Sequence, residues 1–248
     1  RAHEVSVEEL RALFNSSAGA QDRIRAFRQE RLARIGSGDT PVPLVNENGK
    51  IVLHIVPFSA FSLQAKIDPT AAYYLLGKLR PLGASGFTPR YNLYGFINVR
   101  GGGADCFGYT QVFRNGIIEA TKVRAYMERE RGHFIPTLDF DRHILTSLPG
   151  YLDALKQLSV PPPPVIMITI DGVHGVRLGI ANDWFGDAEP ILRSTLELPE
   201  IVIEDYGDDR AYQKAIRPAF DALWNAGGFG KCKHFNDSDV WVGDRPTP

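Results

Sequence analysis

Arg28 and Arg31 lie on the face of a predicted helix where apolar side chains should pack. The helical period of 3.6 residues puts four apolar side chains into the same arc: Ile24, Phe27, Leu32 and Ile35. A guanidinium on such a face needs a carboxylate, a row of carbonyls or an anion, because an unpaired buried charge costs several kcal/mol. One interpretation is an internal ion pair, which we favour for at least one arginine, with an acid from the hairpin 109–123 or from the last helix. The other is a surface that binds an anion or a partner.

Aromatic side chains accompany two further arginines, Arg90 and Arg114, in a predicted sheet. The aromatic residues are Tyr91, Tyr94, Phe96, Tyr109 and Phe113. Aromatic platforms beside arginine can stack nucleic-acid bases or bind peptides, although strand alternation should place about half of these rings in the core. Arg90 and Arg114 therefore join Arg28 and Arg31 as candidate contacts for an anion or a partner.

Carboxylates follow two predicted strands. Asp171 ends one strand with His174 close behind it, and Glu204 and Asp205 end another. Carboxylates at strand ends can hold Mg²⁺ for phosphodiester or nucleotide hydrolysis. However, Asp-Gly is common in turns, and Glu204-Asp205 also precedes a helix start. A metal-dependent nuclease or nucleotide hydrolase using these four residues is an alternative function, and no catalytic residue is assigned.

Other motifs with known chemistry are incomplete. The glycine run after Arg100 lacks the Lys-Ser/Thr of a phosphate-binding loop, and no G-x-S-x-G elbow is present. Cys106 and Cys232 are far apart in sequence, so no disulfide framework is indicated. The run Cys232-Lys233-His234 is half of a metal motif without a second half, and we interpret it as an exposed turn. We expect no metal site and no cofactor.

The composition is that of a globular protein. The chain has 248 residues, 44% of them hydrophobic and 23% charged, which is enough for a substantial core. The net charge of −1 argues against nucleic-acid binding by the surface as a whole. No apolar run approaches the roughly 20 residues that span a bilayer, so we expect no membrane contact. The lack of a disulfide framework fits a reducing compartment, so we expect a cytoplasmic protein. The first residue is Arg1, which suggests processing or a preceding part that is missing.

Hydrophobic periodicity predicts helices at residues 5–14, 23–35, 70–79, 141–158 and 209–225. The first two should be separated by a break at 15–17, and Pro149 should kink or split the fourth. Strands are expected at 51–56, 91–99, 165–170, 176–180 and 201–203, with 176–180 as the antiparallel neighbour of 165–170. His54, inside the first strand, should be a hydrogen-bonded core histidine.

The dipeptide Asn115-Gly116 is the strongest local signal, because it favours a two-residue hairpin loop between strands 109–114 and 117–123. In that register Phe113 opposes Ile118, and Glu119 shares the other face with Arg114. Together the elements predict an α+β fold with a largely antiparallel central sheet flanked by helices. A helical N-terminal segment, residues 1–40, should precede an α+β domain formed by residues 41–248.

Several segments together resemble one known family. They are residues 23–35, 41–44, 51–57 and 109–116, and the run Arg217-Pro218-Ala219-Phe220 with the six residues after it. This set resembles the C-terminal region of bacterial Schlafen/AlbA-type DNA-binding proteins, a family also associated with ATP binding. The resemblance implies that an AlbA-like module precedes this chain and makes the nucleic-acid contact. It implies no catalytic residue.

Our leading functional hypothesis is a non-catalytic sensing or partner-binding domain of a cytosolic bacterial DNA-binding regulator or defence-type protein. It depends on the near-neutral charge, the lack of a catalytic motif and the resemblance. The alternatives are the metal-dependent hydrolase described above and a structural domain for homo-oligomerisation. Convergence of Asp171 with Glu204 would distinguish the hydrolase from the other two.

Overall fold

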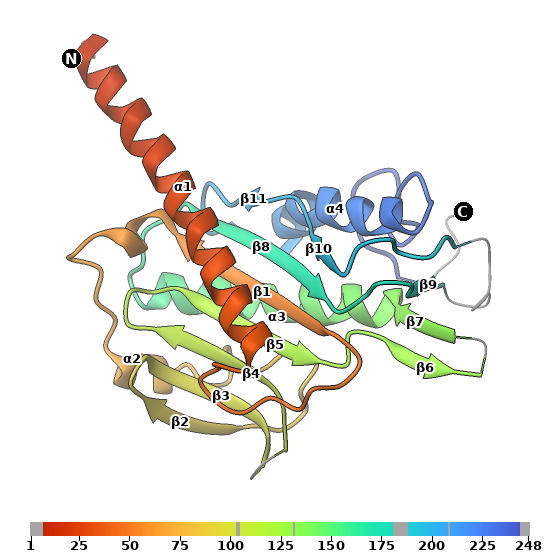
Figure 1. Cartoon of the computed structure of the whole chain (residues 1–248). Helices are drawn as coiled ribbons and strands as arrows, with labels where there is room; N and C mark the ends of the chain where they lie inside the picture. The colour runs from red at the N-terminus through yellow and green to blue at the C-terminus, as the bar shows by residue number, and fades with distance from the viewer. Residues whose placement is uncertain (1–6, 103–104, 131, 181–187, 208, 244–248) are drawn as a thin grey trace.

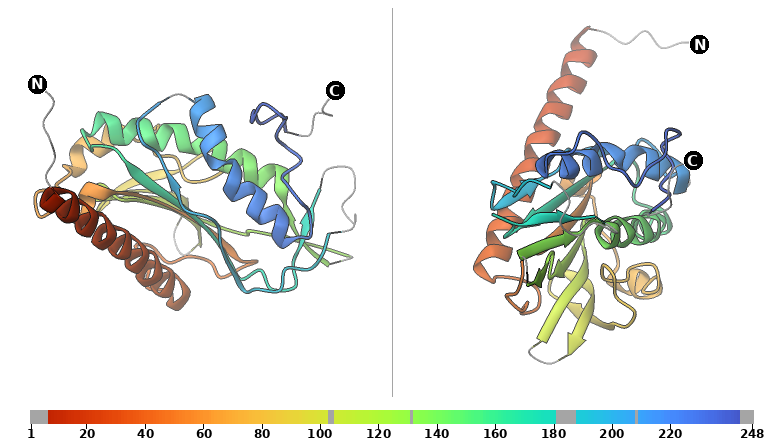
Figure 2. Two further views of the ribbon diagram at one scale, coloured as in Figure 1. Left: turned by 90° about the horizontal axis from the view of Figure 1, so that it is seen from above. Right: turned by 90° about the vertical axis from the view of Figure 1, so that its right-hand side faces the viewer.

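The protein is a three-layer α+β structure with a large antiparallel sheet between helices. The computed structural model describes residues 7–102, 105–130, 132–180, 188–207 and 209–243, with side chains from residue 19 onward. The helix α1 (Val7–Ser37) crosses one face of the sheet, and α3 (Thr137–Gln157) and α4 (Asp209–Ala226) cover the other (Figures 1 and 2). We call these the α1 face and the α3/α4 face. The predicted fold class is confirmed.

The large sheet has the strand order β10-β8-β1-β5-β4-β3-β2, and β11 also pairs with β8. All of its pairings are antiparallel. The strands are β1 (Lys50–Pro57), β2 (Thr88–Asn92), β3 (Gly95–Gly102), β4 (Asp105–Phe113), β5 (Ile118–Val123), β8 (Pro164–Asp171), β10 (Thr195–Glu197) and β11 (Ile201–Val202). Two short helices, η1 (Phe58–Phe61) and α2 (Pro69–Tyr73), follow β1. The predicted helix 70–79 is therefore shorter than expected.

The apolar run of β1, interrupted only by His54, reflects burial on both faces. Leu53 and Ile55 belong to the main core with side chains of α3 and α4, such as Phe140 and Phe220. Val56 belongs to a second cluster under α1. His54, which alternation places on the same face as Val56, is fully buried. A strand covered on both faces cannot show hydrophobic alternation, which is why apolar residues are consecutive on either side of His54.

The predicted break in the N-terminal helix is wrong, because α1 runs unbroken from Val7 to Ser37. Asn and Ser each cost about 0.5 kcal/mol in a helix, which is less than the cost of ending one helix and nucleating another. Ile24 and Ile35 are buried, so the second half of α1 is packed on the sheet. The first half extends past the edge of the sheet (Figures 1 and 2). Pro149 does not split α3 either.

The predicted strand 91–99 is two strands, β2 and β3, with a tight turn between them. The side chain of Asn92 accepts hydrogen bonds from the backbone N–H groups of Tyr94 and Gly95, both at 3.0 Å. Such a local side-chain bond offers the backbone an alternative to an extended strand. This turn was not predicted, because the aromatic and β-branched residues of the segment favour a strand.

The hairpin of β4 and β5 exists, but its register differs from the predicted one. Val112, not Phe113, lies opposite Ile118. The loop has three residues, because Phe113 N–H donates to the carbonyl of Ile117 at 2.8 Å and Gly116 adopts φ of +87°. The shift places Phe113 and Glu119 on the α1 face, which is the arrangement that allows Glu119 to meet α1.

The segment 176–180 does not pair with β8, so that prediction is wrong. Its strand, β9 (Arg177–Gly179), pairs in parallel with β7 (Gly132–Pro136), which in turn pairs with β6 (Met127–Arg129) in a separate three-stranded sheet. The edge of β8 is occupied instead by β10 and β11. Across the described ranges, no helix is both long and apolar enough to cross a membrane.

Candidate functional site

Glu119 on β5 lies at the centre of a buried polar cluster between α1 and the sheet. Its carboxylate accepts two hydrogen bonds from Arg31, from Nε to Oε2 at 2.8 Å and from Nη2 to Oε1 at 2.9 Å. The Tyr109 hydroxyl donates to Oε1 at 2.6 Å, and His54 Nε2 lies 2.9 Å from Oε2. Since a carboxylate only accepts, His54 carries a proton on Nε2. The prediction of an internal pair between this arginine and a hairpin acid is confirmed.

The environment of the cluster determines its charges. Burial alone would raise the pKa of Glu119, but hydrogen bonds from His54 and Arg31 hold that pKa at about 2. Burial raises the pKa of Tyr109, and the negative charge of Glu119 raises it further. At neutral pH the cluster therefore contains a charged Glu119 and Arg31 and a neutral Tyr109. None of the four residues is more than 5% exposed, so the cluster offers no surface to a substrate.

Arg28 is also directed into the protein. Its guanidinium donates to Thr169 Oγ1 at 3.0 and 3.2 Å and to the carbonyl of Ile168 at 3.1 Å. One nitrogen lies 3.3 Å from Glu197 Oε2. Burial lowers the pKa of Arg28, and the charge of Glu197 acts against that shift. Both arginines thus attach α1 to the sheet.

The four residues of the hydrolase alternative do not converge. Asp171 ends β8 and accepts a hydrogen bond from Thr195 Oγ1 at 2.7 Å, and His174 is exposed in the following turn. Glu204 and Asp205 are exposed just after β11, which pairs with the opposite end of β8. The ends of β8, Pro164 and Asp171, are seven residue steps apart, which corresponds to roughly 23 Å at about 3.3 Å per residue. One divalent ion cannot bridge that distance.

Arg90 and Arg114 are the two predicted site arginines that are exposed. Arg114 Nε donates to the carbonyl of Leu93 at 3.2 Å, so this side chain supports the turn between β2 and β3. Arg90 lies on β2 opposite Ile97. Among the residues that the structure describes, Arg90 forms no ion pair. Arg114 forms no ion pair among the described residues either, so the two guanidiniums differ only in that Arg114 is hydrogen-bonded to a backbone carbonyl.

Exposed aromatic rings surround β2. Tyr91 is 55% exposed, and its ring stacks on Tyr73 at 5.8 Å between centroids and an angle of 24°. Both rings contact the buried Phe96 edge to face. Tyr74 is 80% exposed beside Tyr73, with ring centroids 6.1 Å apart. The rim of the sheet at β2 thus exposes apolar side chains that the core does not cover.

A second buried polar cluster joins α3 to the segment after α4. His234 Nδ1 lies 2.6 Å from Asp141 Oδ2, and Cys232 Sγ lies 3.7 Å from the same oxygen. Trp241 Nε1 approaches that oxygen at 3.4 Å. Asp141 and Cys232 are fully buried and His234 is 3% exposed. The interpretation of Cys232-Lys233-His234 as an exposed turn is therefore wrong.

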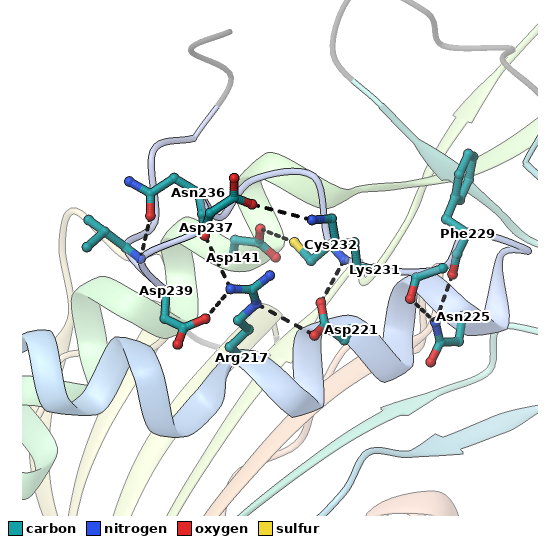
Figure 3. A network of polar contacts seen from close by, with 12 residues as sticks. Asp141, Arg217, Asp221, Asn225, Phe229, Lys231, Cys232, Asn236, Asp237 and Asp239 are labelled. Atoms are coloured by element: carbon teal, nitrogen blue, oxygen red, sulfur yellow. Dashed lines mark hydrogen bonds and ion pairs between the residues drawn. The ribbon is translucent and has the colours of Figure 1, made fainter. Parts of the chain in front are cut away.

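The segment 230–243, which we call the strap, is held against α4 by a polar network (Figure 3). Arg217 donates to the carbonyl of Asn236 at 3.2 Å and pairs with Asp221 and Asp239. Asp221 also accepts from the Cys232 N–H at 2.7 Å. The network fixes the backbone of the strap from outside, so Cys232 and His234 point inward. The spacing of Cys232 and His234 in the sequence indicated half of a metal motif. No sequence pattern near them identified Asp141 as their neighbour, because it precedes Cys232 by 91 positions.

A hollow with a volume of about 580 Å³ lies between β10 and the end of α4. Its lining includes Arg193, Glu197 and Asn225 but none of the residues predicted as a site. Neither a family model, nor a curated protein, nor a solved structure matches this chain. The resemblance to Schlafen/AlbA-type proteins therefore stays a prediction.

Proposed function

We propose that this protein is a non-catalytic partner-binding domain, and that its binding surface is the outer edge of β2. The observation that carries the proposal is that β2 is the last strand of the large sheet. No described residue outside β3 pairs with its backbone. A free strand edge is a template on which an extended segment of another protein can add as a further strand.

The edge offers a short set of backbone groups in a defined register. Pro89 has no N–H, and prolines occur in edge strands with that side turned outward. Alternation along the strand then turns the N–H and C=O of Tyr91 outward together with the C=O of Pro89. A bound segment would make few backbone bonds, so side-chain contacts must supply much of the affinity and the specificity.

The side chains on the two faces of β2 indicate the chemistry of the partner. On the α3/α4 face, the stacked rings of Tyr91 and Tyr73 offer an apolar platform. On the α1 face, Arg90 offers a positive charge without an ion-pair partner among the described residues. The best match is an extended segment that alternates apolar and acidic side chains. Nucleic-acid contact then belongs to another module of the protein, as the resemblance implies.

Selection from a displayed library of random peptides tests this proposal. The protein should enrich peptides with alternating apolar and acidic residues. Fluorescence anisotropy should then show that Tyr91→Ser and Arg90→Glu each weaken their binding about tenfold, which corresponds to about 1.4 kcal/mol. Amide hydrogen exchange of β2 should slow in the complex, because the added strand protects the edge.

Leu192→Ser is the matched control, because Leu192 is an 82% exposed apolar residue away from β2. It should leave peptide binding unchanged. Enriched peptides that bind Tyr91→Ser and wild type equally would overturn the proposal. A dimer in sedimentation that Arg90→Glu dissociates would replace it with the homo-oligomerisation alternative.

A further inference from the structure

We infer that Asp141, Cys232 and His234 form a zinc-binding site that ties the strap to α3. The carboxylate, thiol and imidazole ligand atoms of these residues all lie within 4.8 Å of one another. All three side chains are buried. A mixed oxygen, sulfur and nitrogen set is typical of zinc, whereas magnesium and calcium take oxygen ligands only.

The charges of the set match a divalent cation. A Cys232 thiolate and an Asp141 carboxylate supply two negative charges, and a neutral His234 supplies none. Binding of one Zn²⁺ therefore gives a site with no net charge, which is the favourable state for a buried group.

The hydrogen bonds of Asp141 are unevenly distributed. His234 Nδ1, Cys232 Sγ and Trp241 Nε1 all approach Oδ2, at 2.6, 3.7 and 3.4 Å. The other oxygen, Oδ1, is shielded from solvent and has no hydrogen-bond partner among the described residues. A buried polar atom without a hydrogen-bond partner is unusual in a folded protein. Coordination of a metal ion is one explanation for such an atom.

Zinc binding requires only a small rearrangement. Ligand atoms at about 2.0 to 2.3 Å from a tetrahedral zinc ion lie roughly 3.3 to 3.7 Å apart. His234 Nδ1 and Asp141 Oδ2 are now at hydrogen-bond distance, so they must separate by less than about 1 Å. The Cys232 S–H bond breaks and its proton leaves to solvent. The proton held between His234 Nδ1 and Asp141 Oδ2 must also leave, after which Nδ1 gives its lone pair to zinc and the neutral ring carries its one proton on Nε2.

The position of the ligands indicates a structural role. Asp141 comes from the first turns of α3, and the other two ligands come from the strap. Three protein ligands leave the fourth tetrahedral position to a water molecule. Because all three side chains are buried, the metal would act as a cross-link that closes the long loop between residue 141 and residue 232.

Metal titration of the whole chain tests the site. After treatment with chelator and desalting, wild type should bind about one zinc ion, and its melting temperature should rise on zinc addition. Cobalt added in place of zinc should give the charge-transfer absorption of a cobalt–thiolate bond. Cys232→Ser should lose that absorption, and Asp141→Asn and His234→Gln should each weaken zinc binding by at least about tenfold.

Cys106→Ser is the matched control, because Cys106 is a buried free thiol in a separate cluster with Ile97 and Tyr109. It should bind zinc and cobalt as wild type does. The cobalt spectrum of wild type tests the inference even if Cys232→Ser does not fold. Absence of that charge-transfer absorption in wild type, or its loss in Cys106→Ser with retention in Cys232→Ser, would overturn the proposal.

Discussion

Glu119 shows how one buried charge can be made compatible with a protein core. A carboxylate has about four acceptor positions, and the two bonds from Arg31 with those from Tyr109 and His54 use them all. Removal of one partner would leave a buried charge uncompensated, which typically costs about 3 to 5 kcal/mol. The cluster therefore contributes to the fold as a unit, and single substitutions in it should not be additive.

The pH dependence of stability should report the charge of Glu119. Its pKa is about 2 in the folded protein against an ordinary value of 4.5, so its stabilising contribution is present above pH 4.5 and is lost as the pH falls toward 2. The free energy of unfolding of wild type, relative to that of Glu119→Gln, should fall by about 3 kcal/mol across this interval. Urea unfolding at a series of pH values measures it. A difference that is constant with pH would contradict the assignment.

At the scale of elements, close backbone contacts decide where glycine is needed. A Cβ on Gly150 of α3 would lie 2.6 Å from the carbonyl oxygen of Lys78. That carbonyl belongs to a segment fixed by Asn98, whose side chain donates to the carbonyls of Leu76 and Leu79 at 3.0 and 2.8 Å. The backbone of this segment cannot move away without breaking those bonds.

Two substitutions of a helical glycine by alanine should therefore change the free energy of unfolding in opposite directions. Alanine is favoured over glycine by about 1 kcal/mol inside a helix. Gly19→Ala in α1 should gain this amount, because its added Cβ meets nothing within 4 Å. Gly150→Ala should destabilise the protein despite the same propensity, because the new methyl group overlaps the Lys78 carbonyl. Chemical unfolding of both variants measures the two signs, and stabilisation by Gly150→Ala would refute the close contact.

At the scale of the whole molecule, α1 and the helix pair are coupled through the sheet. The α1 face and the α3/α4 face are the two sides of the same strands, so loss of α1 packing exposes Val56 and Met167 on strands that also form the main core. The second half of α1 should consequently unfold together with the rest of the protein.

Arg31→Ala tests this coupling. It should lower the free energy of unfolding by about 3 to 5 kcal/mol, with circular dichroism and tryptophan fluorescence changing in one coincident transition. Of the three tryptophans, Trp224 and Trp241 report the opposite side, since they pack around α4 and the strap, and Trp184 lies outside the described residues. Arg28→Ala should cost less, about 1 to 3 kcal/mol, because its main partners are a hydroxyl and a carbonyl. A helical signal lost before the fluorescence changes would show that α1 unfolds independently.

Local patterns in the sequence were sufficient for the fold class, for the hairpin at Asn115-Gly116 and for most helices and strands. Periodicity and turn chemistry act over a few residues and can be read without knowledge of the rest of the chain. The position of Arg31 on a packing face also indicated that its charge needs a partner, and an acid of the hairpin was one of the partners expected; Glu119 is that acid.

Only the tertiary structure decided which distant residues meet. The hairpin loop has three residues instead of the predicted two, and this difference shifts the pairing of β4 with β5 by one residue. The shift determines whether Glu119 faces α1. The partner of β9 is β7 and not β8, since β10 and β11 already occupy that edge. Asp141 joins Cys232 and His234 across 91 positions, while Asp171 and Glu204 stay at opposite ends of β8. Such encounters result from the packing of the whole chain, and no local pattern encodes them.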